Sequence, residues 1–265
     1  MAATWLIIVF GLVAGSFLGL CADRLPQGQS VVRPGSRCPH CERPLEAWEN
    51  VPVAAFAWLR GRCRSCRKAI GWPEPAIEIA AAAAFYWSWR RSGGGIEFVR
   101  EAFFLGCLIT LAVTDWRTRQ LPDEITLGGW VTGLVLAVWS GPGLETALAG
   151  SVVGAGGLAL VGWIYYRLRG RMGLGWGDVK MLGLLGAFLG LGGMLAALLV
   201  GCVSGAIVGV AQSGRVLALQ RQRGRSWARA RATAALWPLP FGVFLALGGA
   251  VALAWGPWLW RAWLG

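Results

Sequence analysis

Charged residues are scarce in this chain, and histidine is almost absent. Only 14% of its 265 residues are charged and one is a histidine, whereas a typical soluble domain has about 25% charged residues. Hydrophobic residues make up 56% of the chain and collect in long blocks. These proportions exclude a disordered chain, a secreted disulfide scaffold and an ordinary cytosolic enzyme. The sequence therefore predicts an all-α polytopic membrane protein.

Acidic residues are also few, so the formal net charge is +12. A basic protein of this kind can bind nucleic acid, but here the lysines and arginines lie in the gaps between apolar blocks rather than on one soluble face. Contact with anionic membrane lipid explains that distribution better. We expect membrane lipid and no nucleic acid among the partners; the sequence does not indicate an oligomeric state.

Apolar blocks predict about eight transmembrane helices, since a crossing needs about 20 mostly apolar residues. The sixth block is short, and whether it and the seventh make one crossing or two is left open. The predicted organisation is a first transmembrane helix (1–20), a cytoplasmic insert (21–72) and a seven-helix membrane core (73–265). The eight blocks are 3–20, 74–89, 97–114, 124–140, 146–165, 178–190, 192–212 and 236–256.

The distribution of positive charge predicts the orientation. Alternate loops (21–72, 115–123, 166–177 and 213–235) carry 20 of the 25 lysines and arginines. Because loops rich in these residues stay in the cytoplasm, both termini are expected outside and the four basic loops inside. Glycines repeat every fourth residue at Gly11, Gly15 and Gly19, and again at Gly186 and Gly190, a pattern that indicates close helix packing in lipid.

Four cysteines form a candidate metal site in the predicted insert. They occur as two CxxC pairs, Cys38–Cys41 and Cys63–Cys66, with the spacing of a zinc ribbon. Four thiolates complete a tetrahedral shell and leave no position for water, so the expected Zn²⁺ is structural. A reducing compartment disfavours a disulfide between them. His40 lies between two of the ligands and is expected at the surface.

Two aspartates are the strongest catalytic candidates. Acids at the ends of apolar helices are costly and are often functional, and Asp115 and Asp178 both fall at cytoplasmic helix ends. Two such carboxylates share a proton and perform aspartic-protease chemistry without histidine, serine or metal. The alternative is two separate helix caps or salt bridges with Lys180 or Arg117, and composition alone favours neither.

The order of short motifs resembles the type IV prepilin peptidases, also called prepilin leader peptidase/N-methyltransferases, of the GxGD aspartic protease class. The resemblance covers nearly the whole chain. Its motifs are Gly15–Leu18 with Arg24–Pro26, the four-cysteine insert with Asn50–Pro52, Pro75–Glu78, Thr114–Asp115 with Leu121–Leu127, Gly175–Lys180 and Pro240–Gly242.

This resemblance implies that Asp115 and Asp178 form the catalytic dyad. It assigns supporting roles to Gly175, Gly177, Lys180, Asp123 and Glu78. It also implies cleavage of a short basic leader after a glycine, in type IV prepilins and type II secretion pseudopilins, at the cytoplasmic face of the bacterial inner membrane. The new N-terminal amine is then methylated with S-adenosylmethionine as the donor.

Two positions depart from the family pattern. Gly19 replaces a common asparagine, and Glu74 stands where an aromatic residue is usual. Neither departure removes a dyad acid, but together they leave open a peptidase without methyltransferase activity. Two alternative hypotheses assign the chain to other functional classes, as a polytopic proton-coupled transporter or as a non-catalytic zinc scaffold. The transporter would need a relay acid near mid-membrane, and the scaffold leaves both aspartate motifs unexplained.

Overall fold

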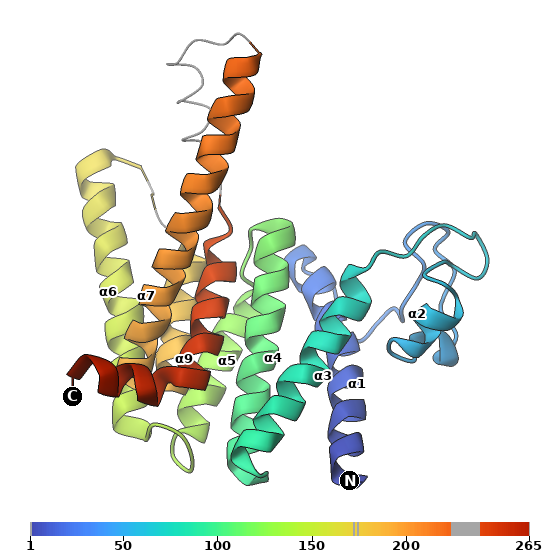
Figure 1. The fold of residues 1–265 in the computed structure, drawn as a ribbon, viewed down its shortest axis with the longest axis horizontal. Coiled ribbons are helices and arrows are strands. Elements are labelled where there is room, and N and C mark those ends of the chain that lie inside the picture. The colour runs from blue at the N-terminus through green and yellow to red at the C-terminus, as the bar shows by residue number, and fades with distance from the viewer. Residues whose placement is uncertain (1, 172, 174, 224–238, 265) are drawn as a thin grey trace.

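The computed structural model describes residues 2–171, 173, 175–223 and 239–264, and in these ranges the regular structure is helical (Figure 1). Part of the predicted loop 213–235 and the start of the predicted block 236–256 lie outside the described residues. The helices are α1 (Ala2–Arg24), η1 (Leu25–Gln27), η2 (Ala47–Asn50), α2 (Ala54–Trp58), α3 (Pro73–Ser92), α4 (Gly95–Thr118), α5 (Asp123–Leu136), α6 (Leu144–Arg169), α7 (Trp176–Gln222) and α9 (Phe241–Leu264).

Each predicted apolar block coincides with a helix or half-helix, although the ends differ by several residues. The chain continues helically beyond several apolar blocks because charged residues extend the last turns. Arg90 and Arg91 extend α3, and Arg167 and Arg169 extend α6. Basic residues at these C-terminal turns interact favourably with the free carbonyls of the helix. Gly93 and Gly170 then end the two helices with positive φ angles, as is common at C-caps.

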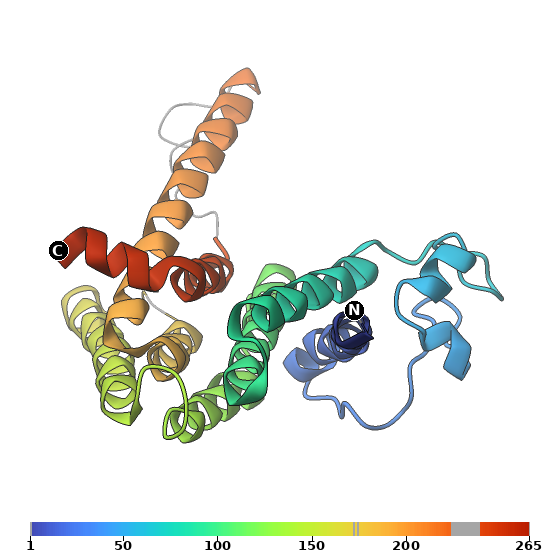
Figure 2. The same cartoon turned by 60° about the horizontal axis from the view of Figure 1, so that its bottom comes forward.

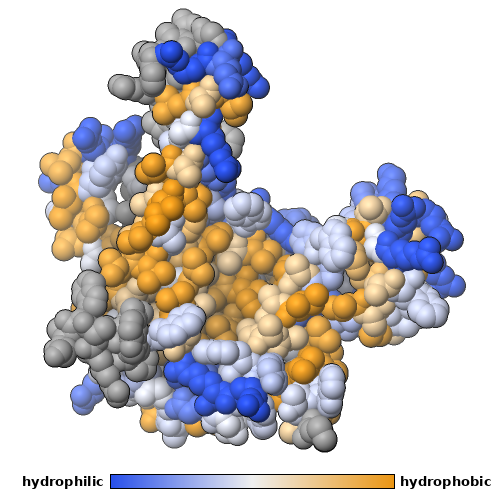
Figure 3. Space-filling model, in the orientation of Figure 1, coloured by the Kyte–Doolittle hydropathy of each residue, from blue (hydrophilic) through white to orange (hydrophobic). Residues whose placement is uncertain are grey.

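By length and composition, three described segments are long and apolar enough to cross a membrane: Ala2–Gln27, Leu144–Arg169 and Trp176–Gln222. Phe241–Gly256 is a shorter apolar helix. Apolar residues also cover the middle of the molecular surface, whereas hydrophilic residues gather on the insert, on the projecting end of α7 and at the opposite edge (Figure 3). An exposed apolar band of this extent is stable in lipid and not in water, so the chain is a multi-pass membrane protein.

Helix α4 lies at the centre of the bundle and links two groups of helices. It packs against α1 and α3 on one side and against α5 and α9 on the other, and Figure 2 shows the insert beyond α1 and α3, on the side away from α6 and α7. The buried core joins α4, α7 and α9 through side chains that include Phe104, Leu111, Leu185, Phe188 and Leu245. This core supports the ends of the three helices that build the site described below.

Glycines allow the closest helix contacts, as predicted. A Cβ atom on Gly11 or Gly15 would lie only 2.6 Å from backbone of α3, and one on Gly186 would overlap the carbonyl group of Gly150 in α6. These contacts leave no room for a side chain. Gly19 is different, because a Cβ atom there would make only an ordinary contact of 3.7 Å with Ile77.

The break in α7 lies at Gly190, which has φ 68° and ψ −177°. The sequence left open whether this region crosses once or twice, and its two predicted blocks, 178–190 and 192–212, meet at residue 191. In the structure the two halves of α7 double back on each other (Figure 1). Their outer parts return to the same end of the bundle, since Gly177 packs against Leu121 and Gly209 against Leu239, and both leucines line one cavity.

A buried arginine binds the end of the first half of α7. A helix break leaves carbonyl groups without partners, and Arg100 donates from Nη1 to the carbonyl of Phe188 at 2.8 Å. Glu97 accepts from Arg100 at 3.1 Å and from the N–H of Gly141 at 2.9 Å. Nearby, Ser88 donates to Glu101 at 3.0 Å. The sequence analysis did not identify this polar cluster, which lies at the end of the bundle opposite Asp115 and Asp178.

Candidate active site

Asp115 lies in the last turn of α4 and is held by the N-terminus of α9. Its carboxylate accepts a hydrogen bond from the N–H of Val243 at 3.2 Å, and the N–H of Gly242 also points to it. The first N–H groups of a helix have no partner within the helix and attract negative charge. The side chain is 6% exposed, so α9 supplies the polar partners that burial would otherwise remove.

Asp178 lies in the first turn of α7, after the N-cap residue Gly175. Its own N–H donates to the carbonyl of Gly175 at 3.2 Å, which fixes the direction of the turn. The carboxylates of Asp178 and Asp115 are close enough to interact electrostatically. The structure thus brings these two acids together from helices that are far apart in the sequence.

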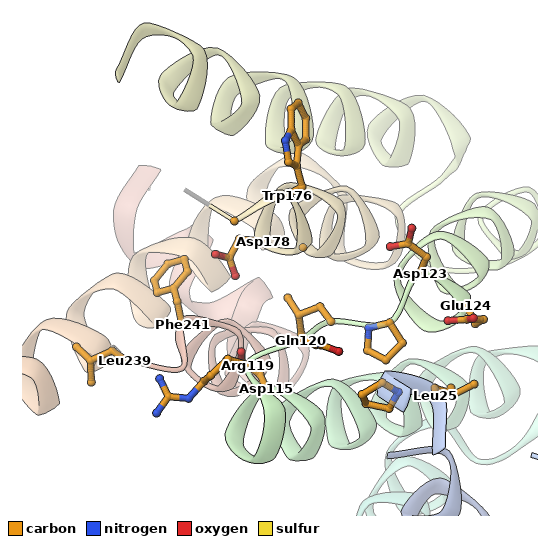
Figure 4. Close-up of a pocket in the computed structure, with 15 residues that line it drawn as sticks. Leu25, Asp115, Arg119, Gln120, Asp123, Glu124, Trp176, Asp178, Leu239 and Phe241 are labelled. Carbon is orange, nitrogen blue, oxygen red and sulfur yellow. The ribbon is translucent and has the colours of Figure 1, made fainter. Parts of the chain in front are cut away.

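Both aspartates line one cavity of about 690 Å³, at the end of the bundle where α4, α5, α7 and α9 meet (Figure 4). Leu25 and Pro26, which follow α1, close one side of it. The other acids on its wall are Asp123 and Glu124. Among the described residues that line the cavity there is no serine, threonine, cysteine or histidine, so carboxylates are its acid–base groups.

Leu121 lies between the start of α7, which carries Asp178, and the start of α9, which binds Asp115. A Cβ atom on Gly177 would lie 2.9 Å from Leu121 Cβ, and one on Gly242 would lie 3.1 Å from Leu121 Cδ2 and 3.0 Å from Asp115 Oδ2. A side chain at either position would have to displace Leu121 or Asp115, so glycine at both positions allows the close approach of the chain. The motifs containing Gly177 and Gly242 appeared in the sequence analysis, but the role of Leu121 between them did not.

Lys180 and Arg117 do not form the salt bridges that were the alternative explanation of the two aspartates. Lys180 Nζ lies 2.6 Å from Asp123 Oδ1 and ties α7 to the start of α5. Arg117 pairs with Asp23 and, at 3.4 Å, with Glu74. Both cations are thus engaged with other acids at the same end of the bundle.

Glu78 is buried away from the cavity, between α3 and the insert. Its Oε2 atom accepts from the N–H of Val53 at 2.7 Å, and it also has a side-chain hydrogen bond with Ser16 of α1. It is not among the residues that line the cavity. Its position indicates that Glu78 fixes the insert to α1 and α3.

The four predicted cysteine ligands converge in the insert. The sulfur atoms of Cys38, Cys41, Cys63 and Cys66 all lie within 4.8 Å of one another, with Cys38 and Cys66 at 3.9 Å and Cys41 and Cys63 at 4.0 Å. A tetrahedral site with Zn–S bonds of about 2.3 Å has sulfur–sulfur edges of about 3.8 Å. The cluster therefore suits a metal ion. His40 is exposed and contacts the carbonyl of Ala69 at 3.3 Å.

The two cysteine pairs lie in equivalent backbone loops, offset by 25 residues. Cys38 N–H donates to Arg43 O and Cys63 N–H donates to Lys68 O, both at 2.9 Å. Each loop also has an isolated β-bridge, Arg37 with Pro44 and Arg62 with Ala69. Backbone N–H groups of Cys66 and Ser65 lower the pKa of the Cys63 thiol to about 6. Hydrogen bonds of this kind favour the thiolate that binds metal.

Comparisons with known proteins agree with the motifs. Residues 9–91 match the family described as bacterial peptidase A24 N-terminal domain, and residues 102–210 match the type IV leader peptidase family. The chain is 35% identical to a prepilin leader peptidase/N-methyltransferase of Burkholderia pseudomallei strain 1026b, over 94% of this chain and 84% of that protein. It is 34% identical to the Pseudomonas putida protein of the same name, over 95% and 90%. No solved structure matches.

Proposed function

The chain belongs to the type IV leader peptidase family, and on that premise we propose that it is an aspartic endopeptidase that removes the leader from type IV prepilins and type II secretion pseudopilins. One observation carries the proposal: Asp115 and Asp178, on different helices, line the same cavity. The wall of that cavity offers no described residue that suits another class of hydrolytic nucleophile. Acid–base catalysis by two carboxylates needs none.

In the proposed reaction the two carboxylates share one proton and act as a unit. The ionised carboxylate removes a proton from water as the water oxygen attacks the scissile carbonyl carbon. The protonated carboxyl group donates its proton to the leaving amine as the carbon–nitrogen bond breaks. The N–H group of Val243 holds one oxygen of Asp115, so the orientation of this carboxylate is fixed before the substrate binds.

We propose supporting roles for the remaining predicted site residues. Gly175 is the N-cap of α7, Gly177 lets the start of this helix approach Leu121 closely, and the Lys180–Asp123 ion pair holds α7 against α5. Glu78 acts at a distance, by fixing the insert. None of these five residues is assigned a proton-transfer step.

The proposed location is the bacterial inner membrane, with about eight crossings and with the cavity and the insert on the cytoplasmic side. The distribution of lysine and arginine among the loops supports this orientation, and residues of two basic loops, 115–123 and 166–177, line the cavity. A prepilin with an apolar helix in the bilayer would then present its leader junction at the level of Asp115 and Asp178. Cleavage after glycine suits this level, since glycine unwinds easily from a helix.

We propose Zn²⁺ for the four-cysteine site, where it would link the two halves of the insert and leave no open coordination position.

The proposal also includes N-methylation of the new N-terminus with S-adenosylmethionine as donor, because the relatives carry that activity in their names. A peptidase without methyltransferase activity is the alternative within the same family.

The dyad is tested with purified protein and a prepilin in a membrane-mimetic assay. Asp115→Asn and Asp178→Asn should each lower the cleavage rate by at least about 10³-fold, and the double variant should lose little more because the pair acts as a unit. Glu124→Gln changes a third acid on the same cavity and should retain most of the activity. Substantial cleavage by either aspartate variant contradicts the proposal.

A further inference from the structure

A second hollow lies beside the proposed active site, between the C-terminal half of α6 and the first turns of α7. It has a volume of about 200 Å³, and its walls include Leu158, Gly162, Trp163, Tyr166, Trp176 and Val179. We call it the α6–α7 pocket. Because its lining is mostly apolar and aromatic, it suits an apolar group and offers few partners to a charged one.

Trp176 connects the α6–α7 pocket with the catalytic cavity. Its side chain lines both spaces, and it precedes Asp178 by two residues. In Figure 4 the indole extends from the start of α7 toward α6, whereas the Asp178 carboxylate lies on the other side of the chain. An extended peptide advances about 3.3 Å per residue. When the substrate bond to be cleaved lies at Asp178, substrate side chains only a few residues away can therefore reach the pocket.

The residues around the α6–α7 pocket indicate its level relative to the membrane. Val161 and Ile164 lie next to its lining residues on α6 and are 55% and 43% exposed, as expected of side chains that face lipid. Arg167 lies over the ring of Trp163 at 5.6 Å. Tryptophan and tyrosine are enriched where a helix leaves the hydrocarbon, and basic residues follow on the cytoplasmic side. The pocket is thus beside the active site at the membrane edge.

We propose that the α6–α7 pocket binds one bulky apolar side chain of the substrate, from the first turn of the apolar segment that follows the cleaved bond. This inference rests on the proposed function, because it assigns the occupant to the substrate of the endopeptidase. Binding a side chain here holds the neighbouring backbone beside the two aspartates and restricts its motion before attack. The pocket is then a specificity site, distinct from the acids that perform the reaction.

Filling the pocket tests the proposal. Gly162→Leu places a large side chain on the pocket wall, and Gly157→Leu is the matched control, since Gly157 is exposed on the same helix and has nothing within 4 Å of an added Cβ atom. Both variants and the unmodified protein are assayed with a parent prepilin and with four derivatives. Each derivative has alanine at one of the first four positions after the cleaved bond.

In the unmodified protein and in Gly157→Leu, alanine at one of these positions should lower kcat/KM by about tenfold or more, as expected for loss of a large apolar contact. In Gly162→Leu the parent substrate should be cleaved correspondingly more slowly, and the same alanine substitution should have little further effect. This loss of additivity identifies the side chain that occupies the pocket. A merely misfolded variant would instead lose activity on all five substrates.

Three results would overturn the inference. One is an unchanged alanine profile in Gly162→Leu, and another is an equal loss on every substrate in a variant that keeps its melting temperature. The third is loss of a co-purifying lipid from Gly162→Leu with no change in the substrate profile, which would assign the pocket to an acyl chain. Absence of cleavage by the unmodified protein contradicts the proposed function itself, so the two failures are distinguishable.

Discussion

The positions of the side chains around the cavity are fixed by contacts with the backbone of other helices. Asp115 receives its hydrogen bond from the start of α9, and Leu121 fills the space between Gly177 and Gly242. Each of these contacts joins residues more than 50 positions apart in the sequence. The positions of the two acids thus depend on small residues that have no chemistry of their own.

At this scale we predict that Gly242→Ala impairs catalysis more than stability. The added methyl group would lie 3.0 Å from Asp115 Oδ2 and 3.1 Å from Leu121 Cδ2, so it must shift the carboxylate or the leucine. Overpacking of this kind costs about 1–3 kcal/mol of folding free energy, while kcat/KM should fall by more than about tenfold because small misplacement of reacting groups is costly. Cleavage kinetics and thermal unfolding measure the two effects.

The control is Gly256→Ala, on the same helix at a position where nothing lies within 4 Å of the added atom. It should change neither quantity appreciably. If Gly242→Ala retains the full cleavage rate, then contact with Gly242 does not set the position of Asp115.

The sequence predicted which acids meet but not what holds them. Asp115 and Asp178 were identifiable because charged residues at the ends of apolar helices are rare and costly. The N–H donor at Val243 has no side-chain signature, since every residue except proline carries one. Leu121 looked like any apolar residue in a motif. Glu78 also has a role beyond its motif, because its hydrogen bond to Val53 depends on how the insert folds back onto α3.

At the scale of single helices, the reversal of α7 at Gly190 affects the fold most. Residues other than glycine rarely adopt φ 68° with ψ −177°. The carbonyl of Phe188, freed by the break, is bound by Arg100, and Arg100 is in turn oriented by Glu97. Glycine therefore gives the break its conformation, and a partly buried ion pair stabilises the same turn.

We predict that Gly190→Ala destabilises the protein by about 1–3 kcal/mol, the cost of forcing a residue with a Cβ atom into this conformation. The added atom would also lie 3.0 Å from Cβ of Pro142. Gly156→Ala is the matched control, because Gly156 lies in the middle of α6 in open space and alanine favours a helix. Thermal unfolding in detergent or nanodiscs compares them; equal melting temperatures would contradict the argument.

Helix positions were largely predictable, because long apolar blocks separated by charged loops have few alternative structures in a membrane. The predicted boundary between the blocks 178–190 and 192–212 lies at residue 191, one residue from the observed break at Gly190. Several glycines occur in this stretch, and the one that leaves the helix is selected by contact with other helices: a Cβ atom on Gly150 would lie 2.7 Å from the carbonyl carbon of Gly190. The polar cluster of Glu97, Arg100 and Glu101 was missed because the sequence analysis considered acids only at the cytoplasmic helix ends, and these residues lie near the other end of α4.

For the molecule as a whole, the insert and the helical bundle are joined by few contacts. The insert folds around its four cysteines and is fixed to α3 through Glu78 and Val53. The cavity that both aspartates line has no lining residue between 27 and 114. These observations separate the part of the molecule that carries the four cysteines from the part that carries the aspartates.

We therefore predict that metal removal unfolds the insert and spares most of the cleavage activity. A zinc chelator, or Cys63→Ser, should increase hydrogen exchange in residues 30–72, because four-thiolate sites of this size supply much of the folding free energy of their loops. Exchange near Asp115 and Asp178 should change little, and methylation should fall more than cleavage. Metal analysis should give one zinc per chain, and Cys202→Ser, which lies outside the cluster, is the control. Rapid exchange of the insert in the zinc-loaded protein would contradict this account.

The shortness of the first half of α7 has a consequence for the supply of water to the reaction. Residues 176–189 span about 21 Å at 1.5 Å per residue, whereas the hydrocarbon core of a bilayer is about 30 Å thick. Residues 181–188 of this segment are all buried among other helices, so protein and not lipid surrounds the segment. Asp178 stands at the end of it and lines the cavity whose wall includes the exposed residues Gln120 and Asp123, so water reaches the acids through this cavity. Hydrolysis of a bond at the border of the membrane then requires no thinning of the lipid around α7.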